Sequence, residues 1–349
     1  MTAREDVPSP APSLPRVAGL VVVDKPLGWT SHDVVSRMRR LAGTRKVGHA
    51  GTLDPAASGV LVLGVERATK LLTYVTGADK TYETTIRLGA ATVTDDAEGD
   101  VMRQAPPERL EALTEEQVRA AVGKLTGEIQ QVPSSVSAIK VNGERSYARV
   151  RRGEDVELAA RPVTVREFTV HTVTRPTDAA AVDLTATVTC TSGTYIRALA
   201  RDLGEALGVG GHLMALRRTR VGSFTLEQAH TLEELAEQVR SGGTVSTVPL
   251  DIAARGLFPV RELSAVQATD LSHGRRIAAE GKTLAVSGDS GDGVVACFAP
   301  DGTLVALAEE RGRGEKRYAT SVLGIAAGVT FTDPAEVSTN NEPGSEGKS

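Results

Sequence analysis

The chain of 349 residues is 40% hydrophobic and carries a formal net charge of −4, which suggests about two domains of roughly 150 residues each, with sizeable cores. Cys190 and Cys297 lie far apart and belong to no C-x-x-C pair, which argues against a disulfide framework or a zinc ribbon and fits a reducing cytosol. The N-terminus lacks the apolar stretch of a signal peptide, and no apolar run is long enough to span a bilayer, so we expect a cytoplasmic protein with no membrane partner.

The first predicted elements follow a tail, residues 1–16, whose proline, serine and alanine content predicts disorder. Gly19–Asp24 is a short apolar run typical of a buried strand. Thr30 or Ser31 can then cap a helix, and Asp33 completes a capping box with Thr30. The apolar positions on one face of this helix are Val34, Val35, Met38, Leu41 and Ala42.

The next stretch alternates strand and helix signals. Val60–Val65 predicts a second buried strand, Arg67–Val75 a short helix and Thr81–Leu88 a further strand. Thr114 opens another capping box, which predicts a helix that ends before Gly127.

Further along, Ala181–Thr191 predicts a long strand, Tyr195–Leu207 an amphipathic helix, and Thr231 a cap for one more helix. Strands and helices mix without regular βαβ alternation, so the predicted class is α+β with a mixed sheet. After Ala254, short strand-like runs alternate with Gly/Asp turns, which predicts a small β-rich domain over about residues 256–331.

The positive charge gathers in three clusters. Residues 34–53 hold five basic residues and no acidic one, and residues 140–152 hold five basic residues against Glu144 alone. Arg217, Arg218 and Arg220 form the third cluster. Such runs are usually solvated faces, but clusters that flank the sharpest motifs favour a phosphate-binding surface.

The most informative segment is a glycine-rich loop, His49–Gly59, between a basic helix and a buried strand. Its glycines permit unusual backbone angles and the close approach of a ligand, and Pro55 biases Asp54 to an extended conformation. Asp54 is therefore one carboxylate on a stiffened loop with positive charge upstream. It is either a turn residue, since Asp-Pro is common in turns, or a functional group on an anchored loop.

The string GHAGTLDPAASGVLVLGVERATK resembles the signature of the TruB family of tRNA pseudouridine-55 synthases. Four further segments resemble family motifs and occur in the family's order. They are Asp24-Lys25-Pro26 with Gly28, Lys80-Thr81-Tyr82-Glu83, Ser192-Gly193-Thr194-Tyr195-Ile196-Arg197 and Leu216-Arg217-Arg218. The resemblance covers about residues 19–225. One departure is Val93, which stands in the Thr92–Gly99 segment where the family has a polar residue.

The resemblance implies the pseudouridine synthase fold, with a mixed, largely antiparallel central sheet and flanking helices over residues 17–255. A small PUA-like domain over residues 256–331 and a disordered acidic tail, residues 332–349, would follow. The implied reaction flips a uridine out of the tRNA T-arm, breaks its C1′–N1 bond and rejoins the base through C5. Substrate and product are isomers, so no cofactor and no metal are expected, and the family implies a monomer.

By similarity, Asp54 would be the essential carboxylate, acting on the ribose or base covalently or removing a proton from the sugar. Arg197 would keep it ionised, since an opposite charge favours the anion, and Tyr82 would stack on the flipped uracil. The residues implied to bind substrate or support the site are Tyr195, Leu216, His49, Lys25 and Asp96. From the residues alone, a helix start explains Tyr195 and core packing explains Leu216, and core packing is the better explanation for a lone Leu or Tyr.

The segment of residues 130–152 resembles the family's RNA-gripping insertion, and its arginines suit phosphate contacts. The basic residues expected to contact RNA are Arg37, Arg40, Lys46, Lys140, Arg145, Arg149, Arg217 and Arg218. Three other interpretations remain open: a guide-RNA-dependent relative of the dyskerin type, a non-catalytic tRNA-binding chaperone, and a structural protein with basic faces. The acidic C-terminal tail favours the stand-alone enzyme over the dyskerin type.

Overall fold

The structure is a computed structural model that describes residues 18–134, 158–177, 179–279, 293–313 and 316–333, together with the backbone of residues 140–141 and 144–145. The predicted N-terminal tail, most of the predicted insertion and nearly all of the acidic tail lie outside these residues. Among the described residues, no helix is both long and apolar enough to cross a membrane.

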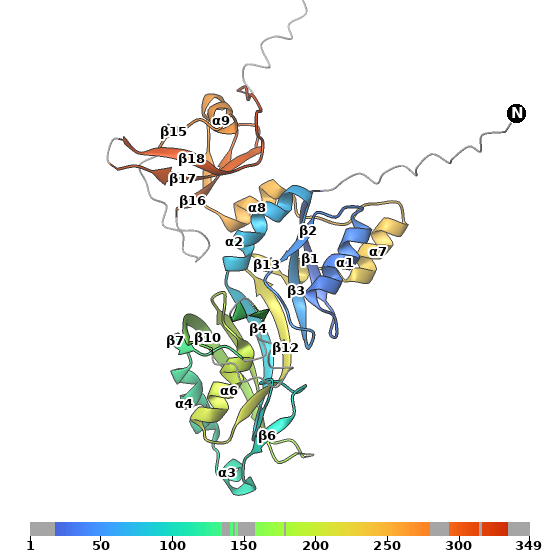
Figure 1. Cartoon of the computed structure of the whole chain (residues 1–349), viewed down its shortest axis with the longest axis vertical. Helices are drawn as coiled ribbons and strands as arrows, with labels where there is room; N and C mark the ends of the chain where they lie inside the picture. The colour runs from blue at the N-terminus through green and yellow to red at the C-terminus, as the bar shows by residue number, and fades with distance from the viewer. Residues whose placement is uncertain are drawn as a thin grey trace, which may run out of the picture.

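A nine-stranded mixed sheet forms the larger part of the molecule (Figure 1). Its main path runs β1-β3-β12-β4-β11-β10-β7, while β2 pairs with β3 and β13 with β12. All neighbours are antiparallel except β3 and β12, which confirms the predicted fold class. The strands are β1 (Gly19–Lys25), β2 (Val47–Ala50), β3 (Ala57–Val65), β4 (Lys80–Leu88), β7 (Gly127–Gln131), β10 (Arg161–Thr174), β11 (Val182–Cys190), β12 (Gly211–Val221) and β13 (Phe224–Thr225).

Three helices begin where the sequence predicts caps. Capping boxes are present at Thr30, Thr114 and Thr231, where each hydroxyl accepts a hydrogen bond from the backbone N–H three residues on. The helices of this part are α1 (Ser31–Leu41), α2 (Leu72–Gly77), α3 (Pro107–Glu111), α4 (Glu115–Lys124), α6 (Ile196–Ala206), α7 (Leu232–Arg240) and α8 (Leu250–Leu257), with the 3-10 helices η1 (Glu66–Leu71) and η2 (Leu226–Gln228).

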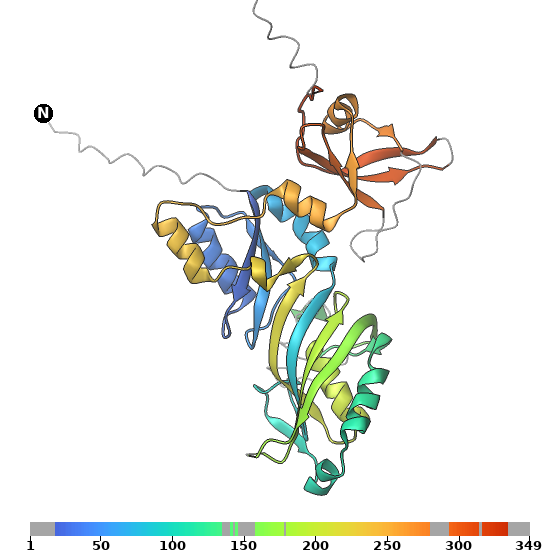
Figure 2. The ribbon, with the colours of Figure 1, turned by 180° about the vertical axis from the view of Figure 1, so that it is seen from behind.

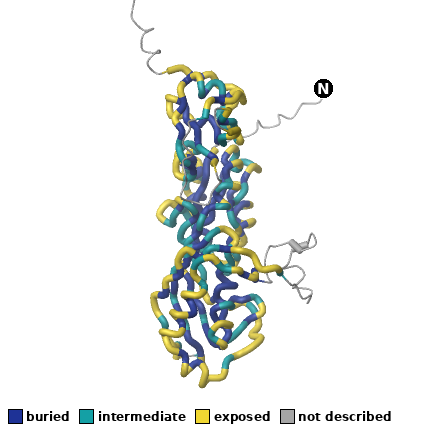
Figure 3. The backbone as a smooth tube through the Cα atoms, turned by 90° about the vertical axis from the view of Figure 1, so that its left-hand side faces the viewer, coloured by how far each residue is buried: buried dark blue, intermediate teal, exposed yellow. Residues whose placement is uncertain are grey.

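Helices α4 and α6 cover one face of β4, β10, β11 and β12 (Figure 1), and no described helix covers the opposite face, which is turned to the viewer in Figure 2. Helices α1 and α7 cover the strands at the other end of the sheet and bury Val34, Met38 and Leu235 against it. Buried backbone runs along the middle of the molecule (Figure 3). Two short hairpins complete this part, β5 (Ala90–Thr92) with β6 (Val101–Gln104) and β8 (Lys140–Val141) with β9 (Glu144–Arg145).

A second, five-stranded sheet forms the β-rich C-terminal unit, in the order β14-β16-β17-β18-β15. Its elements are β14 (Val260–Glu262), α9 (Ala265–Ser272), β15 (Ile277–Ala278), β16 (Val294–Phe298), β17 (Leu304–Arg311) and β18 (Tyr318–Gly324). Phe298 and Leu307 share one core with Ala253 and Phe258 of the α8 region. The predicted boundary between residues 255 and 256 falls inside α8, and it stays a prediction.

The glycine-rich loop is shorter than predicted, because β2 and β3 extend into it from both sides and leave residues 51–56 between them. Gly59 already lies in β3 and has φ of +104°. A Cβ atom there would lie 2.1 Å from the carbonyl oxygen of Arg218. Only glycine permits this approach of β3 to β12.

Candidate functional site

The loop that carries Asp54 is anchored from the start of α1. The Ser31 hydroxyl accepts a hydrogen bond from the Leu53 N–H at 3.0 Å and donates one to the Leu53 carbonyl oxygen at 3.1 Å. The Gly28 N–H donates to the Pro55 carbonyl oxygen at 2.8 Å. Both neighbours of Asp54 are thus fixed, while 45% of the Asp54 side chain remains exposed.

Asp54 forms an ion pair with Arg197, whose Nη2 lies 2.9 Å from the Asp54 carboxylate. Arg197 comes from the first turn of α6, and its side chain is only 9% exposed. Its Nη1 donates to the Thr94 carbonyl oxygen at 3.0 Å and lies 3.6 Å from the carboxylate of Asp96. One guanidinium therefore joins two carboxylates, and the structure brings together Asp54, Arg197 and Asp96 as a cluster.

A cleft of about 260 Å³ opens beside this cluster. Its walls come from four places that are distant in sequence: residues 51–54, strand β4, residues 191–197 and strand β12. Tyr82, Tyr195 and Leu216 line it together with Asp54 and Arg197. A cleft that presents one carboxylate, the guanidinium that pairs with it and two aromatic rings can hold a planar polar ring and act on it with a charged group.

Tyr82 and Arg218 lie in the wall of the cleft. Burial raises the pKa of the Tyr82 phenol, and its side chain hydrogen-bonds with Arg218. Arg218 is 1% exposed, and its guanidinium donates to the carbonyl oxygens of Val60, Thr52 and Gly51 at 2.7, 3.3 and 3.1 Å. The expectation that Arg218 contacts RNA phosphates on the surface is therefore not supported, because its hydrogen-bonding groups face the interior.

Three family profiles match the chain in order: the TruB family pseudouridylate synthase N-terminal domain over residues 39–196, the tRNA pseudouridylate synthase B C-terminal domain over residues 197–250, and the tRNA pseudouridine synthase II C-terminal domain over residues 258–319. A tRNA pseudouridine synthase B from Arthrobacter sp. (strain FB24) is 63% identical over 89% of this chain and 97% of that protein. The chain belongs to the TruB family. A relative of the same description from Thermobifida fusca (strain YX) is 56% identical over 84% of this chain and 94% of that protein.

Solved structures agree on the fold. A chain from the crystal structure of a Cbf5–Nop10–Gar1 complex superposes with a TM-score of 0.61 at 27% identity, covering 91% of this chain and 86% of that chain. A chain from a structure of an H/ACA RNP bound to a substrate RNA containing 2′-deoxyuridine gives a TM-score of 0.64 at 24% identity, covering 90% and 87%.

In this TruB family chain, two lysines are buried close to the cleft. The Nζ of Lys25 donates to the carbonyl oxygens of Pro26 and Trp29 at 2.9 and 2.7 Å, and burial lowers its pKa to about 8 while the charge of Asp54 acts against that change. Lys80 lines the cleft itself, and burial likewise lowers its pKa to about 8. The sequence analysis assigned no role to Lys80, although Lys80 opens the motif that contains Tyr82.

His49 lies on β2 and does not line the cleft. It is half-buried, its ring meets that of His32 edge-on at 5.8 Å, and burial lowers its pKa. Its Nδ1 has no hydrogen-bond partner among the described residues. The geometry thus places His49 near the loop that carries Asp54 but outside the wall of the cleft.

The basic residues predicted to contact RNA differ in how exposed they are and in the partners they have. Arg40 and Lys46 are exposed and Arg37 is half-buried. Arg217 forms two hydrogen bonds with the Asp24 carboxylate, at 2.7 and 3.1 Å. The side chains of Lys140, Arg145 and Arg149 lie outside the described residues.

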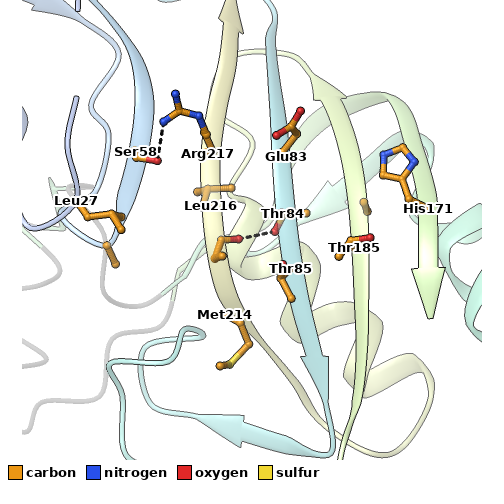
Figure 4. A pocket seen from close by; sticks show the side chains of 13 residues that line it. Leu27, Ser58, Glu83, Thr84, Thr85, His171, Thr185, Met214, Leu216 and Arg217 are labelled. Atoms are coloured by element: carbon orange, nitrogen blue, oxygen red, sulfur yellow. Dashed lines mark hydrogen bonds between the residues drawn. The ribbon is translucent and has the colours of Figure 1, made fainter. Parts of the chain in front are cut away.

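A second hollow, of about 560 Å³, lies on the face of the sheet that no described helix covers (Figure 4). Glu83, His171, Met214 and Arg217 line it, and Leu216 lines both this hollow and the cleft. It contains neither Asp54 nor Arg197, so the candidate site is the smaller cleft.

Proposed function

We propose that this chain converts uridine 55 in the T-loop of tRNA to pseudouridine, with Asp54 as the essential carboxylate. The observation that carries the proposal is the Asp54–Arg197 pair, 2.9 Å apart at a cleft that Tyr82 lines. The family relatives described as tRNA pseudouridine synthase B match nearly their whole length to this chain, which supports tRNA as the substrate.

In the proposed reaction a flipped uridine enters the cleft and stacks on Tyr82. Its C1′–N1 bond breaks, the base turns, and a C1′–C5 bond forms. C5 loses a proton and N1 gains one, so atoms and electrons balance without a donor or an oxidant. Arg197 positions the Asp54 carboxylate beside the nucleoside through their ion pair at 2.9 Å.

Tritium release from T-arm RNA labelled at C5 of uridine tests the proposal. The wild type should release tritium, whereas Asp54→Asn should lower the rate by about 10³-fold or more, since the reaction loses its charged group. RNA binding by Asp54→Asn should persist, because Arg197 keeps its pairing with Asp96. Asp183→Asn is the matched control, since Asp183 pairs with Arg87 at 2.7 Å away from the cleft and its loss should leave the rate unchanged.

Two further results would count against the proposal. A cytidine placed at position 55 of a full-length tRNA should abolish product, so continued tritium release would show that another uridine is the target. A wild type that binds and refolds tRNA without releasing tritium would favour the chaperone interpretation.

We also propose that the enzyme works as a monomer in the cytoplasm. Asp54, Arg197, Tyr82, Tyr195 and Leu216 all belong to one chain and already form the cleft, so a partner subunit is not needed to complete it. Light scattering after size-exclusion chromatography should give the mass of one chain.

A further inference from the structure

Gln131, the last residue of β7, is a buried amide that is 1% exposed. Its Nε2 donates to the backbone carbonyl oxygen of Tyr195 at 3.1 Å, and the Tyr195 N–H donates to its Oε1 at 2.8 Å. One side-chain amide thus makes both hydrogen bonds to a single backbone unit. Two such bonds fix the orientation of that unit far more tightly than one bond would.

The backbone unit held in this way starts the helix that carries Arg197. Tyr195 is the N-cap of α6, and its side chain makes no capping hydrogen bond. Helices α1, α4 and α7 begin instead with capping boxes of their own. In those boxes the helix's own third residue accepts the N–H of the N-cap, whereas at α6 the Tyr195 N–H is accepted by Gln131, a residue outside the helix.

The residues that follow Gln131 also make hydrogen bonds with α6. Arg201, one turn beyond Arg197, donates to the Val132 carbonyl oxygen at 2.6 Å. The Nη1 of Arg197 donates to the Ser134 hydroxyl at 3.4 Å, and Ser134 is fully buried. The segment from Gln131 to Ser134 is thereby bonded to the first two turns of α6, next to the cleft.

We propose that Gln131 is a positioning residue for the isomerisation. It holds the start of α6 so that Tyr195 faces the cleft and Arg197 meets Asp54 in the reactive geometry. Gln131 does not line the cleft, so its effect on the rate passes through Tyr195 and Arg197. This inference rests on the proposed function, because the effect is measured on pseudouridine formation.

The first test is Gln131→Met, which keeps the length of the side chain and removes both hydrogen bonds. We expect the single-turnover rate to fall by about 10- to 100-fold, because small displacements of catalytic groups carry losses of that size. The dissociation constant for T-arm RNA should stay within about twofold, since Gln131 makes no contact that binding would lose.

Gln117→Met is the matched control. Gln117 Oε1 accepts the backbone N–H of Thr114 at 2.9 Å at the start of α4, so the same substitution breaks the same kind of bond at a helix that contributes no residue to the cleft. Its rate should equal that of the wild type.

Gln131→Glu tests the positioning role through the pH dependence of the rate, which a purely structural role would not change. An ionised carboxylate accepts the Tyr195 N–H but cannot donate to the Tyr195 carbonyl oxygen, whereas a neutral carboxyl does both. The ratio of the Gln131→Glu rate to the wild-type rate should therefore rise as the pH falls, while the ratio for Gln131→Met stays flat.

Three outcomes would overturn the inference: a wild-type rate in Gln131→Met, a pH-independent ratio for Gln131→Glu, or a rate loss in Gln131→Met that is matched by weaker RNA binding or by unfolding seen in circular dichroism. An inactive wild type would instead overturn the proposed function, so the two failures are distinguishable.

Discussion

Arg197 and Arg218 show how two arginines near one cleft differ in what they do. Arg197 meets carboxylates and points one nitrogen at Asp54. Arg218 meets only backbone carbonyl oxygens and the Tyr82 hydroxyl in the interactions described above. A guanidinium with five donors in a fixed fork suits several carbonyl acceptors at once, and a lysine does not. Arg218 therefore braces the loop that carries Asp54.

Arg218→Met, which removes both the guanidinium and its charge, should accordingly lower stability more than it lowers RNA affinity. Leaving buried carbonyl groups unpaired costs about 1–3 kcal/mol each, so the midpoint of urea unfolding should fall. The salt dependence of RNA binding should keep its slope, whereas loss of one phosphate contact, as proposed for the exposed Arg40, should reduce the slope by about 1. A reduced slope in Arg218→Met with unchanged stability would show that Arg218 contacts an RNA phosphate.

Lys80 makes stability depend on pH in a defined window. Its pKa is about 8 in the folded chain against an ordinary value of 10.5, so between these values the unfolded chain holds a proton that the folded chain has released. The contribution of Lys80 to the free energy of unfolding therefore increases as the pH rises from about 8 to 10.5. A neutral amine still has two N–H donors for the carbonyl oxygens of Thr76 and Ala78, so these bonds persist.

Urea unfolding of the wild type and of Lys80→Met measures this contribution. The difference in unfolding free energy, wild type minus variant, should be larger at about pH 9 than at about pH 7. A difference that is constant, or that shrinks with rising pH, would show that Lys80 remains charged in the folded chain.

At the scale of elements, the sequence predicted those that carry local signals. The capping boxes at Thr30, Thr114 and Thr231 predicted the starts of α1, α4 and α7, and strand-like composition predicted β4 and β11. It did not predict β12 or β10, because bulges shift the register of β12 between Leu213 and Ala215 and that of β10 between Val170 and Thr172. A bulge interrupts the two-residue period on which strand prediction depends.

The same distinction holds for the site. Family motifs named Asp54, Tyr82 and Arg197, and the structure places all three at one cleft. The contacts that Gln131 and Ser31 make at the site carry no local signal, since their partners, Tyr195 and Leu53, lie 64 and 22 residues away. Only the folded arrangement shows what these two side chains hold in place.

Helix α6 lies so close to β12 that a glycine is required between them. A Cβ atom on Gly204 would lie 2.1 Å from the backbone carbon of Gly210. Gly204→Ala should therefore displace α6, at about 1–3 kcal/mol for such overpacking, and should lower the rate because Arg197 moves with the helix. Gly123→Ala in α4 is the control, since nothing lies within 4 Å of its Cβ position. Equal melting temperatures for the two variants would contradict this account.

At the scale of the whole molecule, the two sheets share a core. Phe298 of β16 is fully buried and packs in the same cluster as Phe258 and Ala254 at the end of α8. The guanidinium of Arg255 lies 3.7 Å from the centre of the Phe298 ring. Such continuity predicts that the two sheets unfold together.

Phe298→Ala should therefore destabilise the entire chain. A buried Phe→Ala change costs about 3–5 kcal/mol, and calorimetry should show a single transition that moves to lower temperature. Val266→Ala, at an exposed position on α9, should leave that transition in place. Two separate transitions, with only one of them shifted, would show that the sheets unfold independently.

The three-residue parallel ladder between β3 and β12, Ala57–Gly59 against Leu216–Arg218, joins β1, β2 and β3 to the rest of the nine-stranded sheet. Asp54 stands three residues before the β3 side of this ladder, and Arg197 lies on α6, which packs against β12. A fragment that ended before β12 would keep Asp54 and Arg197 but lose the wall of the cleft that Leu216 and Arg218 form. Isomerisation activity therefore requires the complete sheet, and an assay of that activity tests whether the sheet has assembled.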